Sequence, residues 1–219
     1  MSITDNYKTI KASIPEDITL VVVSKTHTPE KITEVYNAGA RIFGENKVQE
    51  LINKQPLLPK DIEWHLIGHL QSNKVKYIAP FISMIHSIDS LKLLKEVNAQ
   101  ALKNNRTIKC LLQIHIATEE TKFGLNFKEA ESIITSDELK NLQNINIVGL
   151  MGMATNTKDE KQIAKEFSSL KHFFDTLKNH SSHNIQFTTL SMGMSSDYLL
   201  AIKNGSNLIR VGSAILGNR

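Results

Sequence analysis

The chain has 219 residues, of which 41% are hydrophobic and 22% charged, an ordinary balance for a soluble globular protein of one large or two small domains. Its 26 basic and 22 acidic residues give a net charge of +4 that is spread along the chain, so the charge gives no support for binding to nucleic acid. A single cysteine, Cys110, excludes an internal disulfide and a cysteine metal cluster.

The N-terminal residues give no sign of a targeting segment. The stretch 1–13 lacks the apolar core of a signal peptide, and no apolar run reaches membrane-spanning length. Cys110 lies in the apolar run 108–116, where a buried and inert thiol is expected. These features indicate a cytoplasmic protein that makes no contact with a membrane.

Eight short apolar runs along the chain have the character of β-strands. The first, residues 19–24, contains three consecutive valines, and such β-branched runs are typical of a strand buried on both faces. The strands are predicted at residues 19–24, 41–44, 63–67, 83–88, 108–116, 145–150, 187–190 and 208–211.

Helical patterns separate these runs. A short helix is expected at residues 3–12, ahead of the first strand, because its apolar residues have helical spacing. The next helix begins at Pro29, a residue favoured in the first helical position, and stops at Gly39. Further helices are predicted at residues 45–54, 72–78, 90–103, 128–136, 159–178 and 195–203, with none after the last strand.

The strict alternation of strand and helix predicts an α/β protein with a parallel sheet. Eight such units in this length fit a small single-domain (β/α)8 TIM barrel that spans residues 1–219 and has an extra N-terminal helix. An open, doubly wound sheet is the alternative, because counting strands does not show whether the sheet closes. In either architecture, functional residues collect at the carboxyl ends of the strands.

Lys25 stands at the carboxyl end of the first strand. A lysine at the mouth of a buried strand loses part of its solvation, which favours the neutral and nucleophilic amine. The alternative is a side chain that simply extends to solvent. This residue alone does not decide between the two.

Two loops near the C-terminus have the composition of a phosphate site. Residues 191–197 and the pair Gly212-Ser213 follow the seventh and eighth strands, where barrels often bind phosphate. Arg210 precedes the second loop, and an arginine that faces a barrel mouth needs a ligand or a carboxylate partner. A lysine with a separate phosphate anchor is the arrangement that suits pyridoxal 5′-phosphate (PLP), whose aldehyde reacts with an amine.

The histidines do not form a metal-ligand set. His65 and His69 are four residues apart with Gly68 between them, and no further ligand follows at metal-binding spacing. We therefore predict hydrogen-bonding histidines and no metal ion.

Several motifs closely resemble those of the pyridoxal phosphate homeostasis proteins, a family also called the proline synthetase co-transcribed homologues. The motifs run from the first strand to the C-terminus and occupy residues 22–26, 43–50, 64–74, 190–196 and 209–217. The resemblance implies a barrel similar to the N-terminal domain of alanine racemase, with PLP at the carboxyl ends of the strands.

The resemblance also implies roles for individual residues. Lys25 would form the Schiff base, Asn46 would be a polar neighbour of the cofactor, and Arg210 would face the pyridine nitrogen. The phosphate would be held by Ser191, Met194, Ser195, Gly212 and Ser213.

The expected function is a PLP-binding protein that serves vitamin B6 and amino-acid homeostasis without robust catalysis. Alanine racemase completes its site with a C-terminal domain that supplies a tyrosine, whereas this sequence ends at Arg219, and its four tyrosines lie in predicted helices. We therefore assign no catalytic residue.

A PLP-dependent amino-acid racemase or lyase is the alternative function, and a barrel that binds a sugar phosphate is a third possible function. The expected partners are the cofactor and, transiently, apo-enzymes that use PLP, and the protein is expected to be a monomer.

Overall fold

Residues 2–119 and 123–217 are described by a computed structural model, whose centre is a closed barrel of eight parallel strands. The strands follow one another around the barrel in sequence order, and β1 pairs with both β2 and β8 to close it. The strands are β1 (Thr19–Val23), β2 (Ile42–Glu45), β3 (Glu63–Leu66), β4 (Met84–Ile88), β5 (Ile108–Ile114), β6 (Ile145–Gly152), β7 (Ile185–Ser191) and β8 (Leu208–Val211). The predicted (β/α)8 barrel is confirmed, and the open sheet is excluded.

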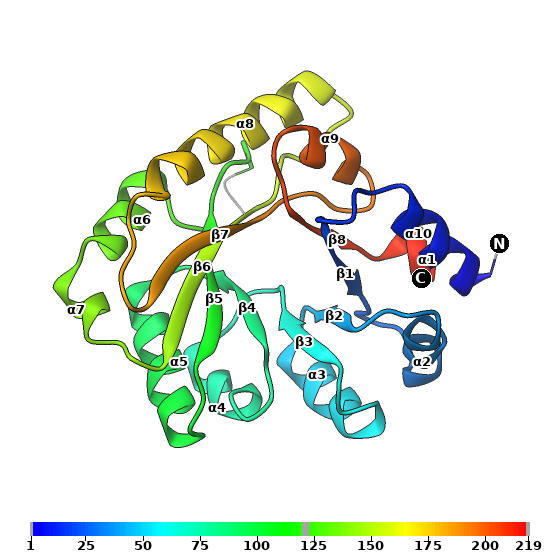
Figure 1. The fold of residues 1–219 in the computed structure, drawn as a ribbon, viewed down its shortest axis with the longest axis horizontal. Helices are drawn as coiled ribbons and strands as arrows, with labels where there is room; N and C mark the ends of the chain where they lie inside the picture. The colour runs from blue at the N-terminus through cyan, green and yellow to red at the C-terminus, as the bar shows by residue number, and fades with distance from the viewer. Residues whose placement is uncertain (1, 120–122, 218–219) are drawn as a thin grey trace.

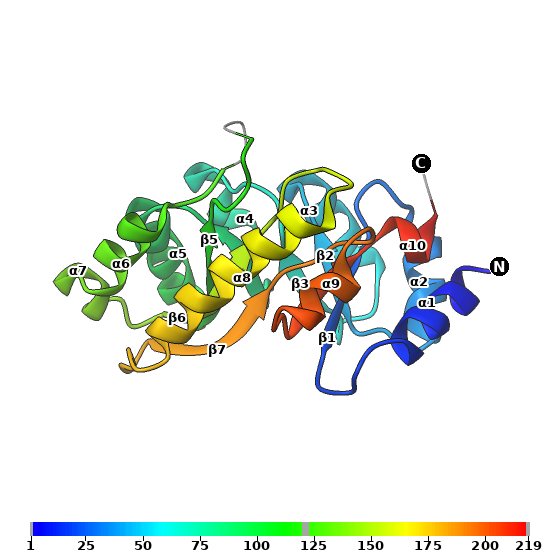
Figure 2. The same ribbon diagram turned by 90° about the horizontal axis from the view of Figure 1, so that it is seen from above.

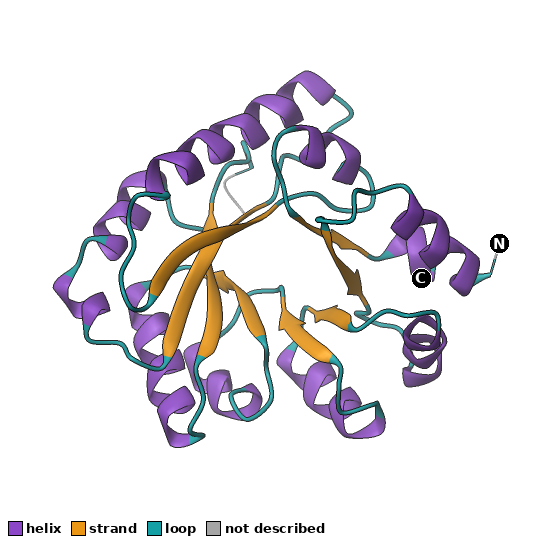
Figure 3. Cartoon of the chain, viewed as in Figure 1, coloured by secondary structure: helices purple, strands orange, loops and turns teal. Residues whose placement is uncertain are grey.

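Helices form an outer layer around the strands (Figures 1 and 3). They are α1 (Ile3–Ala12), α2 (Pro29–Asn37), α3 (Val48–Lys54), α4 (Val75–Ile78), α5 (Leu91–Lys103), α6 (Phe127–Ile134), α7 (Asp137–Lys140), α8 (Glu160–Leu177), α9 (Tyr198–Lys203) and α10 (Ser213–Leu216). Two short 3-10 helices, Gln55–Leu57 and Ser72–Lys74, complete this layer. The predicted extra helix α1 is confirmed. It lies beside α10 (Figure 2), where the Asn6 side chain donates to the Ile215 carbonyl over 3.2 Å.

The structure differs from the predicted helices in several places. The helix predicted at residues 72–78 is a 3-10 turn followed by the four-residue α4, and the helices predicted at 45–54 and 195–203 begin three residues later, as α3 and α9. The helix predicted at 128–136 is α6, and the short helix α7 that follows it was not predicted. Ser136 explains the start of α7, because its hydroxyl accepts from the Leu139 amide and caps the new helix. The prediction that no helix follows the last strand is wrong, since α10 follows β8 after a single residue.

The strands are buried on both faces, as the apolar runs predicted. Residues that point outward from the barrel pack against the helices and form the larger core cluster. A smaller cluster fills the barrel interior and consists of Val21, Met84, Leu111, Val148, Met151 and Leu208. Cys110 belongs to the outer cluster and is fully buried, as predicted, and burial raises the pKa of its thiol because it disfavours the thiolate. Within the described ranges, no helix has both the length and the apolar composition needed to cross a membrane.

Candidate functional site

A cavity of about 600 Å³ lies at the carboxyl ends of the strands, a size typical of small-molecule sites. It is lined by Val23, Lys25, His27, Asn46, Ile67, Met153, Met194, Ser195, Ser196, Arg210, Gly212, Ser213 and Gly217. All but one of the residues predicted for the site are in this lining. The loops after β1, β2, β7 and β8 therefore bring the lysine, the asparagine and the serine-rich segments to the same place as Arg210 of β8.

Ser191 is the exception and lies beneath Arg210. It is fully buried at the end of β7, and its hydroxyl accepts a hydrogen bond from Nη1 of Arg210. The structure thus gives Ser191 a role in holding the arginine, while its predicted contact with a phosphate stays a prediction.

Arg210 is almost completely buried, yet it is one of the residues that line the cavity. Besides Ser191, it donates from Nη2 to the Gly152 carbonyl over 3.1 Å, so both of these acceptors are neutral. Burial lowers the pKa of Arg210 to about 10, although the negative charge of Asp197 acts in the opposite direction. The guanidinium is therefore still charged at neutral pH and presents hydrogen-bond donors to the cavity.

A chain of hydrogen bonds continues from Arg210 into the barrel. The Ser191 hydroxyl lies 3.3 Å from Nδ1 of His86, and Nε2 of His86 lies 3.0 Å from Nδ1 of His65. An arginine can only donate, so Ser191 accepts from Arg210, and its hydroxyl also contacts His86. The His86 ring in turn shares a hydrogen bond with the His65 ring. His65 reaches a second cavity of about 310 Å³ at the opposite end of the barrel.

Both buried histidines are held in the neutral form. Burial lowers the pKa of His65 to about 3, and burial lowers that of His86 well below its usual value, with smaller contributions from electrostatic repulsion by His65, were it protonated, and by Arg210. The predicted hydrogen-bonding role of His65 is confirmed, and so is that of His69, whose Nδ1 lies 3.2 Å from Asp89. No group of three or more potential metal ligands occurs in the described ranges.

This burial predicts a loss of stability in mild acid. The unfolded chain takes up protons near the ordinary histidine pKa of 6.5, whereas folded His65 resists protonation down to about pH 3. The contribution of each buried histidine to the free energy of unfolding is therefore fully present above pH 6.5. Below that pH it falls, down to about pH 4, by about 1.4 kcal/mol per pH unit. Urea unfolding at pH 7, 6 and 5 measures this slope. His65→Gln should lower the slope, and the exposed His172→Gln should leave it unchanged; equal slopes in all three proteins would contradict the prediction.

Asn46 is placed by a close backbone contact with the loop after β3. A Cβ atom on Gly68 would lie 2.4 Å from the Asn46 carbonyl oxygen, so only glycine allows the two loops to approach this closely. Asn46 directly follows β2, which brings it to the cavity that Lys25 also lines.

Ser195 joins the two loops predicted to bind phosphate. Its hydroxyl oxygen lies 3.1 Å from the Gly212 amide and 3.4 Å from the Ala214 amide, and it accepts from both. The loop after β7 is thereby fixed to the loop after β8, and Ser213 is held at the cavity wall.

Sequence reasoning missed several lining residues. His27 had a recognisable signal, since it is a polar residue two positions beyond Lys25 at the same strand end. Val23 and Ile67 had none, because they belong to apolar runs whose composition indicates only burial.

The barrel and the residues at its mouth define a class of protein. A family model described as "Alanine racemase, N-terminal domain" matches residues 1–219. Alanine racemase from Bartonella henselae shares this fold, with a TM-score of 0.74 and 16% identity over 99% of this chain and 60% of that one.

Nearer relatives identify the family within that class. A pyridoxal phosphate homeostasis protein from Helicobacter pylori is 41% identical over 200 residues, which are 90% of this chain and 86% of the relative. PipY of Synechococcus elongatus has a TM-score of 0.92 without PLP and 0.90 with PLP bound, at 34% identity over 99% of this chain and 100% of PipY. The chain belongs to the pyridoxal phosphate homeostasis protein family, as the motifs of the sequence indicated.

Proposed function

We propose that this protein binds PLP, holds it as a Schiff base on Lys25 and serves PLP and amino-acid homeostasis in the cytoplasm. The observation that carries the proposal is the meeting of Lys25, Arg210 and the loops after β7 and β8 in one cavity. The relatives add support, because they are named for PLP homeostasis and PipY has been solved with PLP bound.

The lining fits the chemical groups of PLP. The Lys25 amine condenses with the aldehyde, a reaction that forms one C=N bond, releases one water and needs no oxidant. Asn46 would be a polar neighbour of the cofactor. The phosphate would be held by the loops that contain Met194, Ser195, Gly212 and Ser213, while Ser191 contributes by holding Arg210.

Arg210 favours storage of the cofactor over catalysis. Facing the pyridine nitrogen, its guanidinium would donate a hydrogen bond but would not readily transfer a full proton, which would leave the ring a weaker electron sink. Tyr198, the tyrosine nearest the mouth in sequence, places its hydroxyl 3.4 Å from Ser13 on the α1 side. In this proposal, the protein is a monomeric, single-domain carrier of PLP. Its protein partners are the apo-enzymes that receive the cofactor.

Borohydride reduction of the PLP-treated protein tests this function. The reagent converts the Schiff base into a stable secondary amine, and peptide mass mapping is expected to place the added pyridoxyl phosphate on Lys25. A protein without this adduct after PLP treatment would disprove the proposal and would favour a barrel for an unmodified sugar phosphate.

Solvent deuterium exchange separates the carrier from the alternative of a racemase or lyase. The common amino acids are incubated with the PLP-loaded protein in D2O, and exchange at Cα is followed by NMR. We expect no exchange above that produced by free PLP. Faster exchange would show that the protein is an enzyme.

A further inference from the structure

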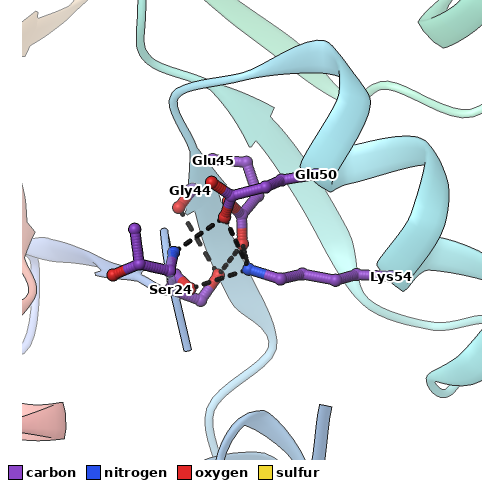
Figure 4. Close-up of polar contacts among 6 residues, drawn as sticks. Ser24, Gly44, Glu45, Glu50 and Lys54 are labelled. Atoms are coloured by element: carbon purple, nitrogen blue, oxygen red, sulfur yellow. Dashed lines mark hydrogen bonds and ion pairs between the residues drawn. The ribbon is translucent and has the colours of Figure 1, made fainter. Parts of the chain in front are cut away.

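A largely buried ionic cluster is formed by Ser24, which precedes Lys25 in the chain, with Glu45, Glu50 and Lys54 (Figure 4). The ammonium of Lys54 donates to the Ser24 carbonyl over 3.0 Å, to Oε1 of Glu45 over 2.8 Å and to Oε2 of Glu50 over 3.0 Å. These three acceptors use all three hydrogens of the ammonium. Lys54 is therefore fixed in one orientation.

The cluster holds the backbone on both sides of Lys25. The Ser24 carbonyl belongs to the peptide plane that precedes the Lys25 Cα, and it accepts from Lys54. The Thr26 amide belongs to the plane that follows, and it donates to Oε2 of Glu50 over 2.7 Å. With both planes anchored, the direction in which the Lys25 side chain leaves the backbone is determined.

Thr26 itself has an unusual conformation that needs such an anchor. Its φ is +66°, in the left-handed region that β-branched residues disfavour. The surrounding contacts must hold a residue of this kind in place, and such positions cluster at functional sites. The Glu50 carboxylate supplies that contact at the amide of the strained residue.

The burial of the cluster makes it costly to maintain. The Glu45 side chain is fully buried and that of Lys54 is 10% exposed. Burial raises the pKa of Glu45, and the hydrogen bonds from Lys54 and Ser24 only partly oppose it. Oε2 of Glu45 has no hydrogen-bond partner among the described residues. A well-packed apolar cluster would serve stability equally well, so the ionic groups point to a task other than stability.

We propose that Lys54 and Glu50 are positioning residues that aim the Lys25 amine into the cofactor cavity by anchoring the two peptide planes that flank it. The inference rests on the proposed function, because Lys25 is the residue expected to react with PLP. Neither Lys54 nor Glu50 is among the residues that line the cofactor cavity. Both lie on α3, four residues apart on one helical face, and the preceding strand β2 also leads into Asn46.

The test compares two ligands that differ in the reacting group. PLP carries the aldehyde, whereas pyridoxine 5′-phosphate has the same ring and phosphate with an alcohol in its place. In Lys54→Met and in Glu50→Ala, the dissociation constant of PLP should rise at least tenfold, while that of pyridoxine 5′-phosphate should change less than twofold. Lys54→Arg, which keeps the charge and the donors, should recover part of the affinity for PLP, and the exposed Lys128→Met is the matched control.

A second measurement reports on the backbone of the cofactor-free protein. Hydrogen exchange at the Thr26 amide should become at least tenfold faster in Glu50→Ala, because the carboxylate that protects it is removed. Glu50 is partly exposed, so this variant serves if Lys54→Met does not fold. Equal losses of affinity for the two ligands, or no loss for either, would overturn the proposal. A wild-type protein that forms no Schiff base would instead refute the proposed function.

Discussion

Replacement of Lys25 by alanine is expected to abolish the absorbance band of the Schiff base that PLP forms with the protein. Lys25 is the only lysine among the described residues that line the cavity, so no other amine of this lining can take its place. The loops at Ser195 and Ser213 and the guanidinium of Arg210 stay in position, and binding of the phosphate and ring should persist. The affinity for PLP should fall on the order of a hundredfold, about 2.7 kcal/mol.

Two control variants make this result specific. Lys25→Arg keeps a positive charge of similar length but cannot form the Schiff base, and it should also lack the band. Lys74→Ala removes a lysine that lines the adjacent cavity of about 430 Å³ and should keep the band. Ultraviolet-visible titration with PLP measures all three proteins. A band that persists in Lys25→Ala would show that another amine holds the cofactor.

The barrel could be predicted from the sequence because its signals are local. Apolar runs such as residues 19–24 are buried on both faces, and each is followed by a helical pattern, so order and composition together indicate a parallel sheet. Polar residues at the strand ends then predict where the site lies, and two of them, Lys25 and Arg210, do line the cavity. Closure of the sheet had no local signal, since it depends on the pairing of β1 with β8, which are far apart in the chain.

The contacts that support the site lie beyond local reasoning. Lys54 looks like an ordinary basic residue in the last turn of a helix, and only the fold places its ammonium on the Ser24 carbonyl. His65 and His86 lie on adjacent strands and meet only inside the barrel. The short helix α10 was missed because four residues are too few to show a helical period.

A second large effect is expected from Gly149→Ala in the middle of β6. A Cβ atom at this position would lie 1.7 Å from the carbonyl oxygen of Thr189 and 2.6 Å from its carbonyl carbon. Both atoms belong to the backbone of the paired strand β7, so no side-chain rotation relieves the clash and the strands must separate. The free energy of unfolding should fall by about 3 kcal/mol, at the upper end of the range for overpacking.

Gly39→Ala is the matched control, because it makes the same chemical change where there is space. No atom lies within 4 Å of a Cβ at Gly39, and only its φ of +111° opposes the side chain, which costs on the order of 1 kcal/mol. Urea unfolding of both variants should therefore show the larger loss for Gly149→Ala, and equal losses would contradict the steric argument. Because β7 carries Ser191, which holds Arg210, the strand separation in Gly149→Ala should also weaken PLP binding, whereas Gly39→Ala should bind as the wild type does.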